Sequence, residues 1–482
     1  LQGRKVGYQG VLSVGRVQTP LLGLVVNRDA EIENFVSKPF FQVIANLLTK
    51  DGDRFKARWQ PSEECLPWQD EEGRVLSRSL VENVAARITN QPAIVTSSKV
   101  KKRLQAPPLP YNLSSLQIDA AKRFGMSAKA VLDTCQSLYE RHKLLTYPRS
   151  DSRFLPVEHL KESSAVLAAI KNNSAALANA VSDADTSLVS KAWNDKKVQA
   201  HHAIIPTARK MDTSKLNQAE RNVYALAARQ YLIQFYPHHE TQESQIELII
   251  AGGIFIAKAS ESLKPGWKQL FPTKNEKQNK KKNEDKGANK TSQQDAALNS
   301  LLPVMKKGDI CSSEAAEILS KETSPPKPFD DASLLAAMTG IARYVKDPEI
   351  RQVLKETDGL GTEATRASII ELLFTRAFLQ RQGKTIRSTP AGKGLINSLP
   401  AMATTPDMTA QWETLLSAIS RKEASYQAFM MPLETALRDL IIQSQMKLPT
   451  GLKDVQSTKP AFKKSAKKKK PAAKKKTKAP AS

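Results

Sequence analysis

The sequence predicts a multidomain α+β protein. Its 482 residues correspond to roughly three domains at about 150 residues each. Strand-like stretches with turn glycines are concentrated in two parts of the chain, and the remaining stretches carry apolar residues at helical spacing. Such segregation of strands and helices is typical of the α+β class.

The first two segments predict a short helical part followed by a β-rich part. Residues 1–36 contain Gly15 and Arg16 ahead of a helix expected from Leu21 to Phe35. Backbone N–H groups at a helix start, together with a guanidinium, can bind a phosphate, although a surface helix cap would have the same sequence. Residues 37–106 are expected to be mostly β.

The next two segments are expected to be a mainly helical part and a second β-rich part. In residues 107–210, Asn112 or Ser114 can cap a helix that ends at Gly125, and Ser127 can cap a second one. Residues 211–320 contain a predicted helix over 216–235, a hairpin over 246–257 on Gly252-Gly253, and a Lys-rich loop over 274–294 that is expected to be disordered.

The last two segments are a helical part and a tail. In residues 321–450, Gly359 and Gly361 predict a turn before a helix that starts at Thr362. No GK[ST] follows these glycines, so the pattern is not a P-loop and ATP use is not expected. Residues 451–482 are Lys-rich and are expected to be disordered.

A tyrosine followed by proline is the first candidate for chemistry. In the run TYPRSDSRFLP, Tyr147 is held at a bend by Pro148. In an extended segment Arg149, Asp151 and Arg153 would lie on the same face as Tyr147. A phenol with a pKa of about 10 is a poor nucleophile at neutral pH, but a nearby cation favours the phenolate and an Arg fork can hold a phosphate. The pattern therefore suits phosphoryl transfer, and a surface turn with ordinary ion pairs is the alternative.

A pair of histidines is the second candidate. His201 and His202 are adjacent, so their imidazoles do not share a face of a helix or strand, and no Cys or acid at ligand spacing joins them. A zinc site is therefore not expected. A histidine could instead bind a phosphate or move a proton.

Charge and cysteine content restrict the partners and the compartment. The formal net charge is +25, and the chain stays basic without its Lys-rich tail, which favours a polyanion partner. Charge alone does not distinguish DNA, RNA and a membrane surface. The cysteines Cys65, Cys135 and Cys311 form no CxxC pair, which indicates a reducing, cytoplasmic setting. No run of about 18 apolar residues predicts a membrane span.

The tyrosine run resembles the active-site motif of the type IA DNA topoisomerases, in the form of the topoisomerase III branch. Five further motifs resemble that family in the expected order: LSVGRVQTP, AHHAIIPT, GLGTEATRASII, IRSTPAGKGLI and PDMTAQWE. The chain has Ser152 where the family often carries Cys and Phe154 where it often carries Tyr, and neither difference affects the expected chemistry.

The resemblance implies roles for individual residues. It makes Tyr147 the nucleophile that becomes linked to a 5′ phosphate, with Arg149 and His201 as further catalytic groups. Residues 339–357 resemble the decatenation loop of the topoisomerase III branch. The expected DNA-binding residues are Arg16, Gln18, Asp151, Arg153, Arg343, Lys346, Thr365 and Arg366.

The resemblance also implies an architecture and an activity. We expect a toroid in which a mainly helical base domain (residues 1–36 and 321–450) and a tyrosine domain (107–210) are joined by a β-rich arch (37–106 and 211–320). An N-terminal Toprim domain is also expected, which this sequence lacks. Mg²⁺ is expected to bind in that missing domain, so no metal ligand is assigned in this chain. The expected activity is ATP-independent cleavage of one strand, passage of another and religation, on single-stranded DNA, duplex DNA or catenanes. A monomer is expected, with a helicase or a single-strand-binding protein as a further partner.

Two other functions compete with this one. The chain could be a truncated, non-catalytic single-stranded DNA-binding fragment, and residues 1–482 alone are expected to bind DNA but barely cleave it. A tyrosine recombinase or a related nuclease would link to the 3′ end instead.

Overall fold

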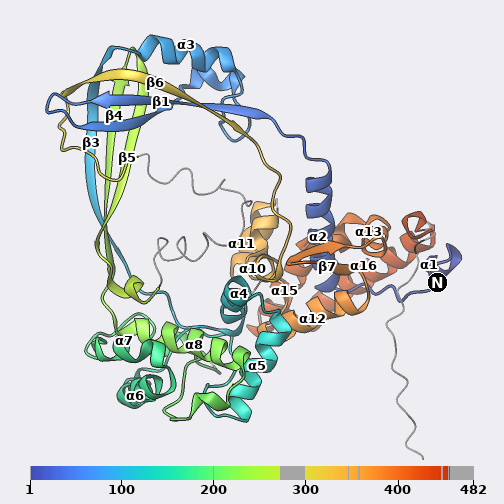
Figure 1. Ribbon diagram of the computed structural model, residues 1–482. Coiled ribbons are helices and arrows are strands. Elements are labelled where there is room, and N and C mark those ends of the chain that lie inside the picture. The colour runs from blue at the N-terminus through green and yellow to red at the C-terminus, as the bar shows by residue number, and fades with distance from the viewer. Residues whose placement is uncertain are drawn as a thin grey trace, which may run out of the picture. The chain divides into compact units, whose positions relative to one another are not determined.

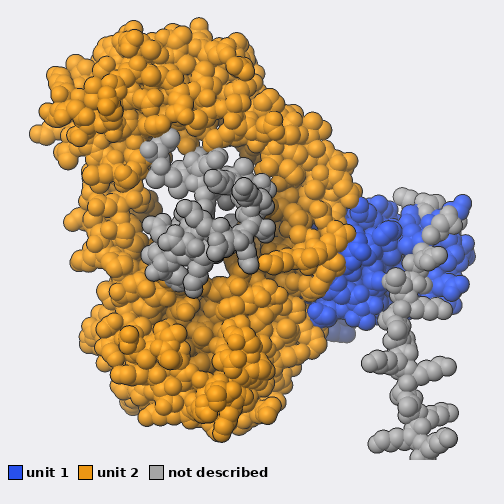
Figure 2. All heavy atoms as spheres, in the orientation of Figure 1, with its two compact units in different colours: residues 1–26, 369–380, 388–482 blue, residues 27–368, 381–387 orange. Residues whose placement is uncertain are grey.

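The computed structural model describes residues 2–198, 200–271, 299–345, 347–356, 359–446, 449–453 and 455. The predicted loop 274–294, Lys346 and most of the tail 451–482 lie outside the described residues. The chain divides into two compact units, each described by itself: unit 1 comprises residues 1–26, 369–380 and 388–482, and unit 2 comprises residues 27–368 and 381–387 (Figure 2). Among the described helices, none is long and apolar enough to cross a lipid bilayer.

Unit 2 contains a closed antiparallel barrel with the strand order β1-β2-β5-β4-β3-β6 (Figure 1). Its interior is filled by alternate strand residues such as Val43, Phe55, Leu248 and Phe255, and helix α3 (Arg78–Ile88) packs on it. The strands are β1 (Pro39–Leu48), β2 (Arg54–Gln60), β3 (Gln91–Gln105), β4 (His239–Ile250), β5 (Gly253–Lys264) and β6 (Ile310–Glu322). The two β-rich stretches of the sequence therefore form one barrel, because β1 and β3 both pair with β6.

The predicted hairpin is confirmed, but its turn lies one residue earlier than expected. Ile250 pairs with Gly253, and Ala251 and Gly252 have φ angles of 46° and 82°. Positive φ at both central residues is the two-residue turn whose twist matches the flanking strands. Gly253 already belongs to β5.

The helical body of unit 2 carries the tyrosine segment. Asn112 caps α4 (Leu113–Phe124), which ends at Gly125 in the left-handed conformation, and Ser127 caps α5 (Ala128–Glu140), as the sequence predicts. Further helices of this body are α6 (Ser163–Asn173), α7 (Ala178–Ser182) and α8 (Gln218–Leu232). Cys135 is buried in its core, as expected.

One predicted domain boundary differs from the structure. The segment 216–235 was assigned to the β-rich arch, yet Leu216, Val223 and Phe235 belong to the same apolar core as Leu138 and Leu144. Helix α8 therefore packs in the tyrosine-bearing body. An amphipathic helix gives no sign in its own sequence of which neighbour it covers.

Unit 2 closes on itself through two connections. The ribbon of β3, β4 and β5 leads from the barrel to the helical body (Figure 1), where Trp267 Nε1 donates to the carbonyl oxygen of Gln105 at 2.9 Å. The chain after β6 continues into α10 (Asp331–Thr339), which packs on α4. Figure 2 shows the atoms of unit 2 as a closed band.

Short elements follow α10, and the remaining helices come from both ends of the chain. A 3-10 turn η8 (Ile341–Tyr344) and α11 (Pro348–Glu356) precede α12 (Glu363–Thr375). The hairpin β7 (Leu379–Gln382) and β8 (Thr385–Ser388) follows. The other helices are α1 (Gln2–Lys5), α2 (Gln18–Glu33), α13 (Pro390–Asn397), α14 (Ala401–Thr404), α15 (Asp407–Ser420) and α16 (Tyr426–Met446).

Candidate active site

The segment that leads to Tyr147 is fixed by a second segment far along the chain. Leu145 forms an antiparallel bridge with Pro206, and the backbone N–H of Thr146 donates to the carbonyl oxygen of Ile205 at 3.0 Å. The Thr146 hydroxyl accepts from the Ile205 N–H at 3.0 Å. These bonds bring the two candidate sequences, around Tyr147 and around His201, side by side.

Tyr147 presents its ring at the surface between two aromatic neighbours. The side chain is 40% exposed. Its ring stacks on His201 with centroids 4.8 Å apart and planes at 19°, and Tyr139 of α5 meets it edge-on at 5.9 Å. Aromatic pairs at these separations attract one another beyond the area that they bury. The phenol is therefore held in one orientation while it stays accessible.

The predicted alternation after Tyr147 is wrong, because the chain turns at Pro148 and Arg149 instead of running extended. Arg149 is exposed and makes no hydrogen bond or ion pair with any residue that the structure describes. Asp151 lies 3.9 Å from His201, between Oδ1 and Nδ1. Arg153 points into the body, where Nε and Nη2 donate to the carbonyl oxygens of Pro110 at 2.9 Å and Leu109 at 2.8 Å.

Arg153 is half-buried, whereas Arg149 is exposed. Removal from water lowers the pKa of Arg153, and the nearby Tyr111 opposes this shift. Two main-chain acceptors hold its guanidinium, so Arg153 fixes the end of the tyrosine segment. Arg149 is the arginine of this segment that an anion can reach.

The structure separates the two adjacent histidines. His201 faces Tyr147, whereas His202 turns the other way, lies beside His159 with ring centroids 4.7 Å apart, and donates from Nδ1 to the carbonyl oxygen of Ala203 at 2.8 Å. Burial lowers the pKa of His202, and the neighbouring His159 and His201 lower it further, against the opposing bond to Ala203. His201 thus belongs with Tyr139, Tyr147 and Asp151 to one group of side chains, the tyrosine cluster.

Arg366 does not lie on the surface, where a strand-contacting residue was expected. Its side chain is 1% exposed, and Nη1 lies 2.8 Å from both Glu363 Oε1 and Ser114 Oγ. A direct contact with a bound strand, which stays a prediction, would require this side chain to leave its buried site. Glu363 is a residue that the sequence did not single out, although an acidic residue in the first turn of a helix is a recognisable favourable pattern.

The remaining predicted DNA-binding residues are distributed over both units. Arg16 and Gln18 belong to unit 1, where Arg16 is exposed and its carbonyl oxygen accepts from the Thr409 hydroxyl. Thr365 is exposed in unit 2 and shares a hydrogen bond of 3.0 Å with the Thr362 hydroxyl. Arg343 is exposed on η8 in unit 2.

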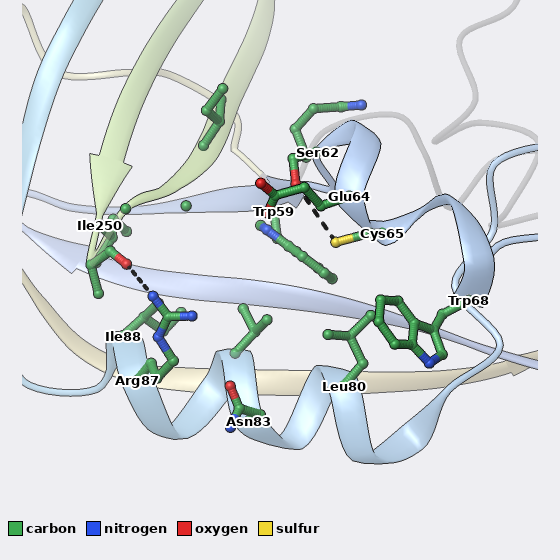
Figure 3. A pocket seen from close by; sticks show the side chains of 16 residues that line it. Trp59, Ser62, Glu64, Cys65, Trp68, Leu80, Asn83, Arg87, Ile88 and Ile250 are labelled. Carbon is green, nitrogen blue, oxygen red and sulfur yellow. Dashed lines mark hydrogen bonds between the residues drawn. The ribbon is translucent and has the colours of Figure 1, made fainter.

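Two hollows lie away from the tyrosine. One, of about 430 Å³, lies in unit 2 between α3, the 3-10 turn η1 (Glu63–Trp68) and the β4–β5 turn, and Figure 3 shows Trp59, Trp68 and Arg87 around it. The other, of about 620 Å³, lies in unit 1 and is lined by apolar residues such as Trp412 and Leu437. Neither contains a residue of the tyrosine cluster.

The described residues offer no group of three or more His, Cys, Asp or Glu side chains arranged to hold a metal ion. The donor set of the tyrosine cluster therefore does not fit a bound Mg²⁺ on its own, since Asp151 is its only carboxylate among those described near His201.

Comparison with known proteins identifies the family. A family model described as DNA topoisomerase matches residues 1–431. The chain is 53% identical over 472 residues to DNA topoisomerase 3 of Vibrio cholerae, covering 96% of this chain and 70% of that protein. It is 50% identical over 483 residues to the Haemophilus influenzae protein of the same name, covering 97% and 71%. This chain belongs to the type IA DNA topoisomerases, in the topoisomerase III branch.

A solved structure supports the fold of this topoisomerase chain. Full-length topoisomerase I from Thermotoga maritima superposes with a TM-score of 0.59 at 18% identity, and the match covers 90% of this chain and 64% of that one. The similarity shows a mixed helix and strand fold of the type IA class, as the sequence predicted. Residues 145–151 and 201–207 form the candidate active site of a family member that spans about 70% of its Vibrio relative.

Proposed function

We propose that Tyr147 of this chain is the nucleophile through which single DNA strands are cleaved and rejoined, without ATP. The observation that carries the proposal is the exposed Tyr147 ring stacked on His201 at 4.8 Å, within a motif of a topoisomerase family. The activity would relax negative supercoils and unlink DNA circles. Its substrates would be single-stranded DNA and duplexes or catenanes with single-stranded regions.

The chemistry assigned to these residues is a transesterification. The Tyr147 oxygen attacks the phosphorus of a phosphodiester, the bond from phosphorus to the 3′ oxygen breaks, and the 5′ phosphate stays on the tyrosine. Rejoining reverses the step, so the energy of the phosphodiester is kept and ATP is not needed. In this proposal the exposed Arg149 binds the phosphate oxygens as charge develops on them. His201 fixes the plane of the phenol, and a nitrogen of its ring gives the phosphate a second contact besides the Arg149 guanidinium.

Mg²⁺ is part of this proposal through the family resemblance alone. The residues that the structure describes form no cluster of ligands for it, so no step is assigned to the metal. Basic residues on the rest of the chain would supply affinity for the DNA backbone, and this affinity should fall with salt because bound phosphates release counterions.

An end-labelled oligonucleotide tests the proposal. The protein is mixed with single-stranded DNA and Mg²⁺, the reaction is stopped with denaturant, and covalent adduct is measured. Attachment to the 5′ phosphate gives labelled protein from a 3′-labelled strand but not from a 5′-labelled one. The reverse pattern would indicate a recombinase-like enzyme, and binding without any adduct would indicate a DNA-binding fragment.

The variant Tyr147→Phe should lose the adduct and keep DNA binding, because only the hydroxyl is removed. Tyr139→Phe is the matched control, since Tyr139 is the neighbouring tyrosine at 5.9 Å and should keep the adduct. An adduct that survives in Tyr147→Phe and vanishes in Tyr139→Phe would reassign the nucleophile.

Residues 339–357 are proposed to act in unlinking DNA circles. Part of this segment is packed, since Ile341 and Val345 are buried and Arg351 donates to the carbonyl oxygen of Val345 at 2.9 Å. Arg343 and the half-exposed Tyr344 are available for charge and stacking contacts with a second strand. Replacing both with Ala should reduce decatenation more than relaxation, and equal loss of the two activities would contradict the proposal.

A further inference from the structure

The N-terminus of α4 receives two acceptors from distant parts of the chain. The free N–H groups of a helix start need partners. The Ser115 N–H donates to Asn112 Oδ1, which caps the helix. The Leu113 N–H donates to the carbonyl oxygen of Ser150 at 3.0 Å, and the Ser114 N–H donates to Glu363 Oε2 at 2.7 Å. The tyrosine segment and α12 thus meet at one helix end.

Glu363 is the centre of this meeting point. Its Oε1 accepts from Arg366 at 2.8 Å and from Asn112 Nδ2 at 3.2 Å, and the same Asn112 nitrogen also donates to the carbonyl oxygen of Asp151 at 3.2 Å. Arg366 completes the set by donating to Ser114 Oγ at 2.8 Å. Glu363, Arg366 and Ser114 are all less than a tenth exposed.

This network continues to the reacting groups. It holds the main chain at residues 150 and 151, directly after the turn that follows Tyr147. The side chain of Asp151 lies 3.9 Å from His201, and the His201 ring stacks on Tyr147. A displacement of residue 151 therefore moves the partner of the histidine that orients the phenol.

We propose that Glu363 and Arg366 are positioning residues, which fix the tyrosine segment for cleavage through the N-terminus of α4. The inference rests on the proposed function, and it gives Arg366 a role different from the strand contact that its motif predicted. A movement that separates α12 from α4 would remove the support of residues 150 and 151. Cleavage is consequently possible only while the two helices are in contact.

The chemistry of the site makes Glu363→Gln a sharp perturbation. Both carboxylate oxygens accept hydrogen bonds, Oε2 from Ser114 and Oε1 from Arg366 and Asn112. The glutamine side chain has an NH₂ group in place of one carboxylate oxygen. This NH₂ group, itself a donor, must then face either the Ser114 N–H or the Arg366 guanidinium, which are donors as well. The double variant Glu363→Gln/Arg366→Met removes the buried unpaired charge as well, which separates electrostatic strain from the loss of positioning.

The test compares cleavage, binding and local structure. Glu363→Gln should lower the single-turnover cleavage rate at saturating oligonucleotide by about tenfold or more, while the Kd, measured in a Tyr147→Phe background, changes by less than about twofold. The double variant should regain thermal stability but not cleavage. Asp133→Asn is the matched control, because Asp133 forms an exposed pair with Lys129 on α5, and it should change neither quantity.

Amide hydrogen exchange gives a readout that does not need activity. In Glu363→Gln the amides of Leu113 and Ser114 and those of residues 150–154 should exchange about tenfold faster, while the amides of α5 stay unchanged. Failure of the wild type to form any adduct would overturn the proposed function, whereas unchanged exchange would overturn this inference. Loss of DNA affinity in step with cleavage would also overturn it, because it would place the two residues on the DNA.

Discussion

Two histidine–carboxylate pairs in the helical body of unit 2 use the same groups in opposite ways. His142 and Glu220 are 3.2 Å apart with side chains 8% and 7% exposed, whereas His201 and Asp151 are 3.9 Å apart with side chains 43% and 52% exposed. Residue type alone therefore does not decide whether such a pair stabilises the fold or is available to take part in a reaction. Burial and the number of other partners decide it.

The buried pair is surrounded by further hydrogen bonds. Glu220 Oε1 accepts from Ser137 at 2.7 Å, and Oε2 accepts from the Asn217 N–H at 2.9 Å in the capping box of α8. Glu220 thus joins the end of α5, the start of α8 and His142, which precedes the tyrosine segment. Within the described part of the chain, no comparable set of side-chain hydrogen bonds surrounds the exposed pair, and its histidine stacks on Tyr147.

The largest effect is expected at the buried pair. Glu220→Ala removes the capping box and leaves His142 and Ser137 without their acceptor, so the unfolding free energy should fall by about 3 kcal/mol, more than a hundredfold in the folding equilibrium. Urea unfolding followed by circular dichroism measures this change. Glu140→Ala, an exposed carboxylate at the end of α5, should change stability by less than about 0.5 kcal/mol, and equal effects of the two variants would remove the distinction between the pairs.

A change at the exposed pair should affect chemistry instead of stability. His201→Ala removes the ring that stacks on Tyr147 and should lower single-turnover cleavage by about 100-fold, with a change in unfolding free energy below about 0.5 kcal/mol. His202→Ala is the neighbouring control and should retain most of the cleavage, since His202 faces away from Tyr147. If His202→Ala were the more damaging variant in cleavage, the assignment of the two histidines would be reversed.

The smallest effect is a pH dependence of the buried pair. Burial alone would raise the pKa of Glu220, but hydrogen bonds from Ser137 and Asn217 and the facing His142 hold it below the usual value of 4.5. A folded-state pKa below the unfolded value contributes stability that is present above the unfolded pKa and is lost as the pH falls through the folded pKa. The stability advantage of wild type over Glu220→Gln should therefore be constant near neutral pH and shrink below about pH 4. An advantage that stays constant or grows on acidification would contradict this assignment.

Local signals in the sequence were enough to predict several elements of this fold. The caps at Asn112 and Ser127, the stop at Gly125 and the hairpin at residues 246–257 all depend on neighbouring residues, and the structure confirms them. The bend at Pro148 is local as well, and it presents Tyr147 at the surface. The family motifs added the prediction that Tyr147 is the nucleophile, because they extend over contiguous residues.

Only the tertiary structure decided which distant residues meet. Helix α8 packs in the tyrosine-bearing body and not in the arch, His201 rather than His202 stacks on Tyr147, and Arg366 is buried against Ser114. Each of these outcomes depends on contacts between segments far apart in the chain. The periodicity of a helix or the spacing of a motif fixes which side chains share a face, but the neighbour that this face meets is determined by the packing of the whole unit.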